Sequence, residues 1–446
     1  ELSKIIGESY FNLNQFENAV PYLLDYKGRN GKWSNTDYYL LGYSYYKQGD
    51  YTNAIQQFNK IIGGTNNVSQ NAYYHLAECY LKLDKKPEAL NAFRNASQMD
   101  FSPEIQKDAF LNYARLSYEI GNAYENVPTV LTNYLVKYPK DEYASEIQEL
   151  LVDSYITSKN FAGAMELLEK NKSYASKATY QKVAFYRGVE LYLTTDYSGA
   201  ITAFEKSTPE YDELAYNLAY TYFKLKDYTN AATYFNTYAN SNPEDDKKHD
   251  AYLRLGDSYF VSSKYWPAIE AYNKALEGNG IEKDYAAFQK ALSYGFVDRV
   301  ATKMEELNAF ITKYPTSTLK DDVLFELGNS YVRANKEDEG LRIYDRLISE
   351  YKGSSLVPQA IVRQGLVYYN SNRSEQALSK FKTVVRDYPN TQEAIQAVTT
   401  AKLIYVDLGR VNEYADWVRG LDFVEVTDAE LDNATFESAD QKQLEG

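Results

Sequence analysis

The strongest constraint on the fold of this 446-residue chain is a small residue that recurs at intervals of 31 to 38 residues. It is glycine or alanine in all but one of eleven successive units. The positions are Gly7, Gly42, Ala77, Ala114, Val152, Gly188, Ala219, Gly256, Ala291, Gly328 and Gly365. Because the chain exceeds the length that one hydrophobic core usually serves, the period predicts an array of repeated units.

Other positions share this period. A tyrosine stands three residues after the small residue in nine of the eleven units. Nine units also have a second small residue at the twelfth position after it and a large apolar residue at the sixteenth. In the unit of Gly42 these residues are Tyr45, Ala54 and Phe58. The spacing places Gly42 and Tyr45 on one face of a first helix, and it places Ala54 and Phe58 on one face of a second. Each unit therefore predicts two helices.

Turn signals separate the predicted helices. Asp50 and Asp227 directly follow Gly49 and Lys226, which gives a helix stop and then an N-cap. Prolines close several units, because their ring and missing N–H prevent a helix from continuing.

The small residues indicate how the two helices meet. Helices approach closely only where side chains are small, so we expect Gly42 to face Ala54, with Tyr45 and Phe58 filling the space on either side. The recurrent tyrosine is therefore mainly a packing residue in this interpretation.

This spacing of small, tyrosine, alanine and large apolar positions resembles the tetratricopeptide repeat (TPR) family over residues 2 to about 420. The resemblance implies an all-α fold, an α-solenoid that winds as a right-handed superhelix of about eleven to twelve helix pairs. Repeat four (roughly 106–141) and repeat nine (285–316) depart from the pattern and predict shifted second helices. The short spacing before Ala219, with Pro209 inside it, predicts a truncated second helix and a change of stacking near 205–212.

The chain thus divides into a solenoid at 1–420 and a segment at 421–446. We expect the latter to be a linker and the first helix of a truncated further repeat, with Ala439 at the small position and Gly446 at the turn. On this interpretation the sequence is a fragment, or the ordered part, of a longer protein.

Composition and charge exclude some classes of function. The net charge is −14 and no basic stripe is present, which argues against nucleic acid as a partner. No segment approaches the roughly 20 apolar residues that span a bilayer. The first ten residues lack the regions of a signal peptide, and a signal that has been removed remains an open alternative.

Candidate catalytic and metal-binding residues are few. Cys79 follows His75 by four residues, which allows Cys–His chemistry, but a buried thiol beside an imidazole that lines a groove is the favoured alternative. His249 has no partner at ligand spacing. The carboxylates at 244–250 lack the spacing and glycine of a calcium loop and suggest a solvated acidic loop. We therefore expect neither an enzyme nor a bound metal or cofactor.

Aromatic side chains gather at the positions that should line the concave face, which the first helices form. Tyrosine gives large contact area at low entropic cost, so the sequence predicts a protein or peptide ligand. For Tyr43, Tyr74 and Tyr220, packing and exposed binding are equally supported. The partner-binding candidates are Tyr39, Tyr43, Tyr74, His75, Phe185, Tyr186, Tyr216, Asn217, Tyr220 and Arg254.

A subset of the family holds the C-terminal carboxylates of chaperones in a clamp of Lys, Asn and Arg. Asn217 and Arg254 match only a part of that clamp, and Phe185 stands where the clamp needs a lysine. The resemblance therefore does not imply a chaperone co-factor.

The segments FITKYPTSTLKDDVLFELGNSY and FKTVVRDYPNTQEA resemble bacterial envelope TPR proteins in style, such as those of the Tol–Pal and outer-membrane assembly systems. This implies a non-enzymatic adaptor that is periplasmic or outer-membrane-associated, and a cytoplasmic location remains open. Two alternatives also remain open. One is a glycan-binding envelope protein that uses tyrosine faces as stacking platforms, and the other is the scaffold portion of a longer enzyme.

Overall fold

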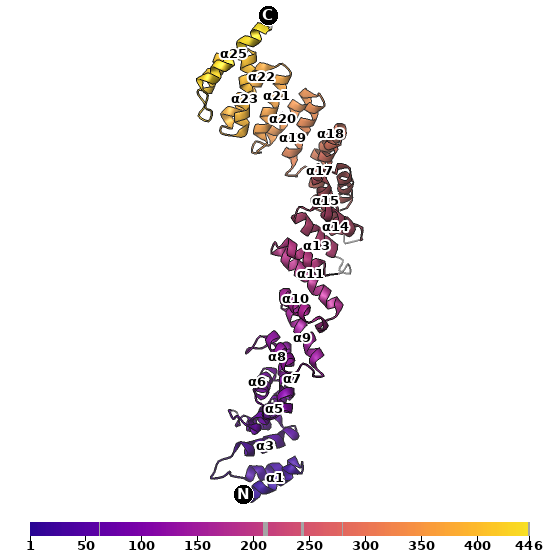
Figure 1. Cartoon of the computed structure of the whole chain (residues 1–446), viewed down its shortest axis with the longest axis vertical. Helices are drawn as coiled ribbons and strands as arrows, with labels where there is room; N and C mark the ends of the chain where they lie inside the picture. The colour runs from indigo at the N-terminus through magenta and orange to yellow at the C-terminus, as the bar shows by residue number, and fades with distance from the viewer. Residues whose placement is uncertain (62, 208–212, 242–244, 279, 445–446) are drawn as a thin grey trace. The chain divides into compact units, whose positions relative to one another are not determined.

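A computed structural model describes residues 1–61, 63–207, 213–241, 245–278 and 280–444 (Figure 1). Within these ranges the chain is all-helical, with an isolated bridge between Arg29 and Lys32 and no strand. The all-α prediction is confirmed. The helices are α1 (Leu2–Asn12), α2 (Phe16–Asp25), α3 (Asn35–Lys47), α4 (Tyr51–Phe58), α5 (Asn67–Lys82), α6 (Lys86–Ser97), α7 (Pro103–Ile120), α8 (Val127–Lys137), α9 (Ala144–Thr157), α10 (Phe161–Lys170), a 3-10 turn η1 (Lys172–Tyr174), α11 (Lys177–Leu193), α12 (Tyr197–Phe204), α13 (Leu214–Lys224), α14 (Tyr228–Asn240), α15 (Asp245–Val261), α16 (Tyr265–Leu276), α17 (Lys283–Phe296), α18 (Val300–Lys313), α19 (Lys320–Arg333), α20 (Glu337–Glu350), α21 (Val357–Asn370), α22 (Ser374–Asp387), α23 (Gln392–Asp407), α24 (Val411–Val418) and α25 (Asp428–Leu444).

The helices form a stack of pairs. Within each compact unit, a first helix packs on the second helix of its own pair, and a second helix packs on the first helix of the next pair, as in α5, α6 and α7. Within each unit some first helices of successive pairs also touch, among them α3 with α5 and α21 with α23, so the outward side chains of these helices lie side by side. We call the surface of these outward side chains the first-helix face. The arrangement is that of an α-solenoid, and its right-handed sense stays a prediction.

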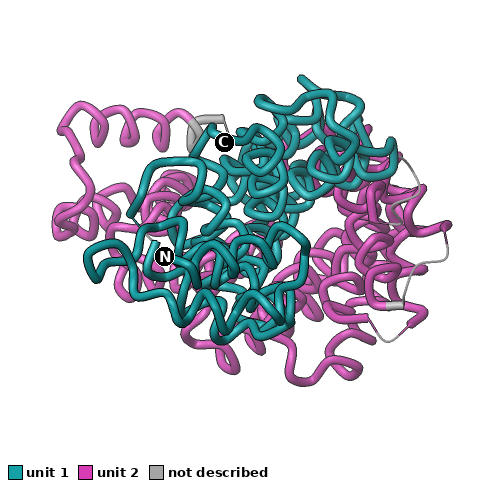
Figure 2. Tube along the Cα trace, turned by 90° about the horizontal axis from the view of Figure 1, so that it is seen from below, with its two compact units in different colours: residues 1–208 teal, residues 209–446 magenta. Residues whose placement is uncertain are grey.

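The chain separates into two compact units, Glu1–Thr208 and Pro209–Gly446, which Figure 2 colours separately. Unit 1 contains α1 to α12, and unit 2 contains α13 to α25. The expected change of stacking near 205–212 falls in part on residues 208–212, which lie outside the described residues. The boundary at 420 also stays a prediction.

The distance from the small residue to the second helix is almost constant. In the unit of Gly42, α4 begins at Tyr51, nine residues later. The same interval separates Ala291 from the start of α18 at Val300, so the expected shift in repeat nine is wrong. Lys303 occupies the alanine position of that repeat, and its ammonium lies 2.7 Å from Glu326.

Repeat four carries the one large departure among the described units. Here α8 begins at Val127, thirteen residues after Ala114, so the predicted shift is confirmed and amounts to about one helical turn. Val130 and Tyr134 are fully buried in the places that alanine and phenylalanine fill elsewhere.

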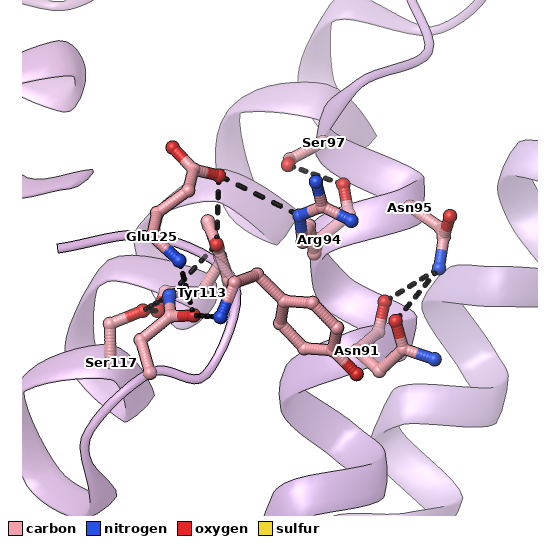
Figure 3. Close-up of polar contacts among 9 residues, drawn as sticks. Asn91, Arg94, Asn95, Ser97, Tyr113, Ser117 and Glu125 are labelled. Atoms are coloured by element: carbon pink, nitrogen blue, oxygen red, sulfur yellow. Dashed lines mark hydrogen bonds and ion pairs between the residues drawn. The ribbon is translucent and has the colours of Figure 1, made fainter. Parts of the chain in front are cut away.

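A polar loop at 121–126 accommodates this shift (Figure 3). The Asn122 side chain accepts hydrogen bonds from the backbone N–H groups of Tyr124 and Glu125, and its amide donates to Ser117 Oγ at 2.8 Å. Tyr113 donates to the Glu125 carboxylate at 3.0 Å, and Arg94 approaches the same carboxylate (Figure 3). These contacts fix the start of α8 after the longer connection.

Regular units share one turn geometry. The seventh residue after the small residue has a positive φ, for example 76° at Gly49 and 67° at Thr195. The next backbone N–H then donates to the carbonyl of the recurrent tyrosine, as Asp50 does to Tyr45 at 3.0 Å. This is the 6→1 hydrogen bond of a Schellman motif, and it ends the first helix at the same place in each regular unit.

The recurrent small residue packs directly against a large side chain of the second helix. A Cβ atom on Gly42 would lie 2.9 Å from Phe58 Cε1, and its other near neighbour is Gln57. In the repeat of Gly328 the two small positions do approach each other, because a Cβ atom on Gly340 would lie 3.1 Å from the Gly328 carbonyl oxygen. The expected approach of Gly42 to Ala54 stays a prediction. Ala54 is fully buried in the same helix pair, but the ring of Phe58 lies over the glycine.

The last helices only partly follow the expected register. Gly409 has a φ of 68° and marks the turn before α24, as expected. In α25 the fully buried small residue is Ala434, whereas Ala439 is exposed. The register based on Ala439 stays a prediction. Gly446 lies outside the described residues. In unit 1, α12 ends at Phe204 after eight residues, which agrees with a truncated second helix, although α4 is equally short.

Candidate functional site

An aromatic cluster lies on the first-helix face of α3 and α5. Its centre is the imidazole of His75, and the ring centroids of Tyr43, Tyr46 and Tyr74 lie 4.9, 5.0 and 5.3 Å from that of His75. Tyr39 stacks on Tyr43 at 5.8 Å. These five rings are all partly exposed, so they pack on one another and still present surface. The structure thus brings four of the predicted partner-binding residues together.

Polar contacts fix this cluster. His75 Nδ1 lies 2.7 Å from a carboxylate oxygen of Glu78, and the Tyr74 hydroxyl donates to Asp108 at 2.5 Å. Burial, and then the hydrogen bond to Asp108, raises the pKa of Tyr74. The ammonium of Lys47 lies 5.2 Å from the centroid of Tyr43, within cation–π range. The cluster is therefore ordered by its neighbours, with both charge signs at its edge.

Cys79 takes no part in the cluster. Its side chain is fully buried, and burial, followed by the nearby charge of Glu78, raises the pKa of the thiol to about 12. A thiol in this state is a poor nucleophile and a poor metal ligand. His75 is paired with Glu78 instead, so the structure favours the buried-thiol alternative for this pair.

A metal site is not found in the part of the chain that the structure describes, where no group of three or more His, Cys, Asp or Glu side chains could hold an ion. Glu244 of the acidic run lies outside the described residues. Among the described helices, none is both long and apolar enough to cross a membrane.

Phe185 and Tyr186 of α11 have different environments. Phe185 is 7% exposed and packs against Phe204, so it offers little surface to a partner. Tyr186 is 40% exposed and stacks on Phe161 at 5.1 Å. Of the two candidates, Tyr186 is the accessible one.

A second group of candidates lies in unit 2. Tyr216 and Tyr220 of α13 both donate to Asp250 of α15, Tyr216 at 2.6 Å. Burial, and then the hydrogen bond to Asp250, raises the pKa of Tyr220 to about 12. Asn217 donates to the Glu213 carbonyl at 2.9 Å within its own helix. The two tyrosines are thus tied to the next helix pair through one carboxylate.

Arg254 is held by three carboxylates. Its guanidinium nitrogens lie 3.5 Å from Asp250, 3.0 Å from Asp257 and 2.6 Å from Glu282. Asp257 also accepts from the hydroxyl of Tyr272 at 2.9 Å. All three nitrogens of Arg254 are therefore engaged, which leaves no free fork for a ligand carboxylate. In this structure the arginine of the partial clamp match is paired with carboxylates of the chain itself.

Sequence reasoning missed the carboxylates that order the tyrosines. Asp108 and Asp250 each lie 34 residues after the tyrosine that donates to them, Tyr74 and Tyr216. Because 34 residues is close to one repeat, a tyrosine and an aspartate at this separation fall on adjacent first helices. That spacing was available in the sequence as a signal.

Comparisons with known proteins agree with the repeat. The family model described as tetratricopeptide repeat matches residues 212–245, 322–354 and 359–391. The model described as anaphase-promoting complex, cyclosome, subunit 3 matches residues 12–96. No curated protein matches the chain.

Several solved structures are similar in outline. A structure of Naa15/Naa10 bound to HypK-THB is 13% identical, with a TM-score of 0.40, and the match covers 99% of this chain and 72% of that one. Yeast Tom70 is 16% identical, with a TM-score of 0.33 and coverage of 100% and 96%. YrrB, described as a TPR protein with an unusual peptide-binding site, is 18% identical, with a TM-score of 0.36 and coverage of 45% and 96%.

The repeat spacing, the stacked helix pairs and the matching repeat models agree with one another. Tetratricopeptide repeats are matched at residues 212–245, 322–354 and 359–391, and the helix pairs within each compact unit pack in the same way.

Proposed function

We propose that this protein is a non-enzymatic scaffold that binds a polypeptide on its first-helix face. The observation that carries the proposal is the cluster of Tyr39, Tyr43, Tyr74 and His75, whose rings are ordered by one another and yet partly exposed. Rigid aromatic side chains give binding energy at low entropic cost, which is why they dominate protein interfaces.

The charges around the candidate residues support a ligand that is not an acidic chain terminus. Arg254 is neutralised by Asp250, Asp257 and Glu282, so that group has more carboxylates than cations. The protein as a whole has a net charge of −14. A neutral or basic peptide fits this electrostatic environment better than an acidic one.

The absence of enzymatic activity is part of the proposal. It is supported by the buried thiol of Cys79 with its raised pKa, and by the pairing of His75 with Glu78. We also propose that the scaffold is an adaptor in a bacterial envelope assembly, at the periplasm or outer membrane. The support for this is the style of the repeats near 310–331 and 381–394, and fractionation of source cells would test it.

A random peptide library displayed on phage tests the proposed ligand class. We expect selection on the whole chain to enrich one peptide family, whose affinity falls about tenfold or more when Tyr43→Ala and Tyr74→Ala are combined. Tyr22→Ala is the matched control, because Tyr22 is a partly exposed tyrosine of the second helix α2. Equal affinity in all three proteins would overturn the proposed site, and failure to enrich any peptide would overturn the proposed function.

A further inference from the structure

A pocket of about 710 Å³ opens where repeat four departs from the regular spacing. Its walls are the start of α8, the last turn of α9 and the residue that caps α10, Asn160, with Tyr118 of α7 at one side. The shifted start of α8 places its first two turns beside α9 at this point. The volume lies within the range of roughly 300–1,000 Å³ that small-molecule sites occupy.

The wall of this pocket carries no ionisable side chain other than tyrosine. Its lining residues are Asn, Thr, Ser and Tyr, together with Val127 and Pro128. Because no lysine or arginine is present, the wall offers nothing to neutralise a phosphate or carboxylate, and because no carboxylate is present, it offers nothing to a cation. The pocket therefore suits a neutral ligand.

One wall has free hydrogen-bonding groups. The side chains of Asn126, Thr129, Thr132 and Asn133 make no hydrogen bond within the described ranges, although two are amides with both donors and acceptors. At the far side, Asn160 uses its oxygen to cap α10 at Gly163 N, 2.9 Å away, which leaves its two N–H donors unused there.

The opposite wall offers mainly acceptors. The hydroxyl of Thr157 donates to the Asp153 carbonyl at 2.9 Å, and that of Ser158 donates to the Ser154 carbonyl at 2.7 Å. The proton of each hydroxyl is then engaged, but the oxygen can still accept a hydrogen bond from a ligand. A ligand that both donates and accepts at closely spaced positions would satisfy the two walls together.

We propose that this pocket is a binding site for a short neutral oligosaccharide. Each sugar hydroxyl donates and accepts one or more hydrogen bonds, which matches free amides on α8 and hydroxyl acceptors on α9. The rings of Tyr118 and Tyr155, with Val127 and Pro128, give the wall apolar surface on which the C–H face of a sugar ring can pack. The pocket shares no residue with the aromatic cluster around His75, so the inference does not depend on the proposed function.

An array of neutral and acidic oligosaccharides, probed with the full chain, tests the proposal, and the strongest neutral member is then titrated calorimetrically. We expect retention of at least one neutral glycan, and a loss of affinity of about tenfold or more when Thr132→Val and Asn133→Ala are combined. Both residues are exposed, so the fold should be kept. Thr129→Val is a second variant in case the first fails to fold.

Two controls locate the binding. Thr237→Val removes the hydroxyl of a comparable exposed threonine on the second helix α14, and Tyr43→Ala alters the aromatic cluster. Neither should change glycan affinity. The proposal is overturned if no neutral glycan is retained, if the α8 variants bind as the wild type does, or if a library-selected peptide displaces the glycan from this pocket.

Discussion

A Cβ atom on Gly188 would lie 2.5 Å from both Cδ1 and Cε1 of Phe204, so the ring of Phe204 rests directly on the backbone of α11. The same relationship joins Gly256 to the ring of Tyr272. The recurrent small residue therefore leaves room for the side chain of the large residue sixteen positions later. Because the ring is fully buried in each case, a larger side chain at the small position must push the two helices apart.

A larger residue in place of Gly188 should destabilise unit 1. Gly188→Leu is expected to cost about 1–3 kcal/mol, because the added side chain overlaps Phe204. Hydrogen exchange in α11 and α12 measures the change locally, since solenoid repeats depend mainly on their neighbours. Gly353→Leu is the control, because no atom lies within 4 Å of a Cβ built there. Unchanged protection in α11 would contradict the packing.

His249 and Gly278 make a second tight contact. A Cβ atom on Gly278 would overlap the imidazole of His249, which is 9% exposed. We expect Gly278→Ala to lower the stability of unit 2 by about 1–3 kcal/mol in the wild-type background. In a His249→Ala background the same substitution should cost much less, because the imidazole that it would overlap is gone. Denaturant titration of the four proteins gives the coupling energy. Simple additivity would show that the two residues do not meet.

The turn at Thr195 predicts a stabilising change. Thr195 has a φ of 67°, a conformation that costs a residue with a side chain roughly 1–2 kcal/mol and that glycine adopts freely. We expect Thr195→Gly to raise the stability of unit 1 by about 1 kcal/mol, after the entropic cost of glycine is subtracted. Gly49→Ala, at a φ of 76°, should have the opposite sign. A lower melting temperature for Thr195→Gly would contradict the turn geometry.

Alkaline pH should loosen the α13–α15 contact. The pKa of Tyr220 is raised to about 12 by burial and by Asp250, whereas a tyrosine in the unfolded chain titrates near 10. The stabilising contribution is therefore complete below about pH 10 and is lost as the pH rises through about 12. Denaturant midpoints over this window should fall more steeply for the wild type than for Tyr220→Phe. Parallel slopes would show that Tyr220 is not the group responsible.

The helix pairs were predictable because packing recurs at fixed positions in the sequence. The small residue and the large residue sixteen positions later, as in Gly42 and Phe58, predicted the helix register, and the structure adds that the ring of Phe58 lies over Gly42. The helix stop at Lys226 was predicted, but its positive φ was not, because lysine has no preference for positive φ. There the hydrogen bond from Asp227 to the Tyr222 carbonyl imposes the conformation.

The candidate site was predictable only in part. Tyr43 and Tyr74 were placed on the first helices by their distance from the small residue, and the structure brings them together around His75. The pairing of Arg254 with Glu282 depends on where the start of α17 lies beside α15. These two side chains come from different helix pairs and meet because the pairs stack on each other. The residue pattern within one repeat does not predict the distance between them.

The most direct test of the scaffold is photo-crosslinking of a random peptide pool to the whole chain, with a photoreactive residue replacing Tyr43 in one protein and Tyr22 in another. Our account predicts peptide adducts at position 43 and few at position 22, because Tyr43 lies on the first-helix face and Tyr22 on a second helix. Equal labelling at the two positions, or labelling at 22 alone, would contradict it.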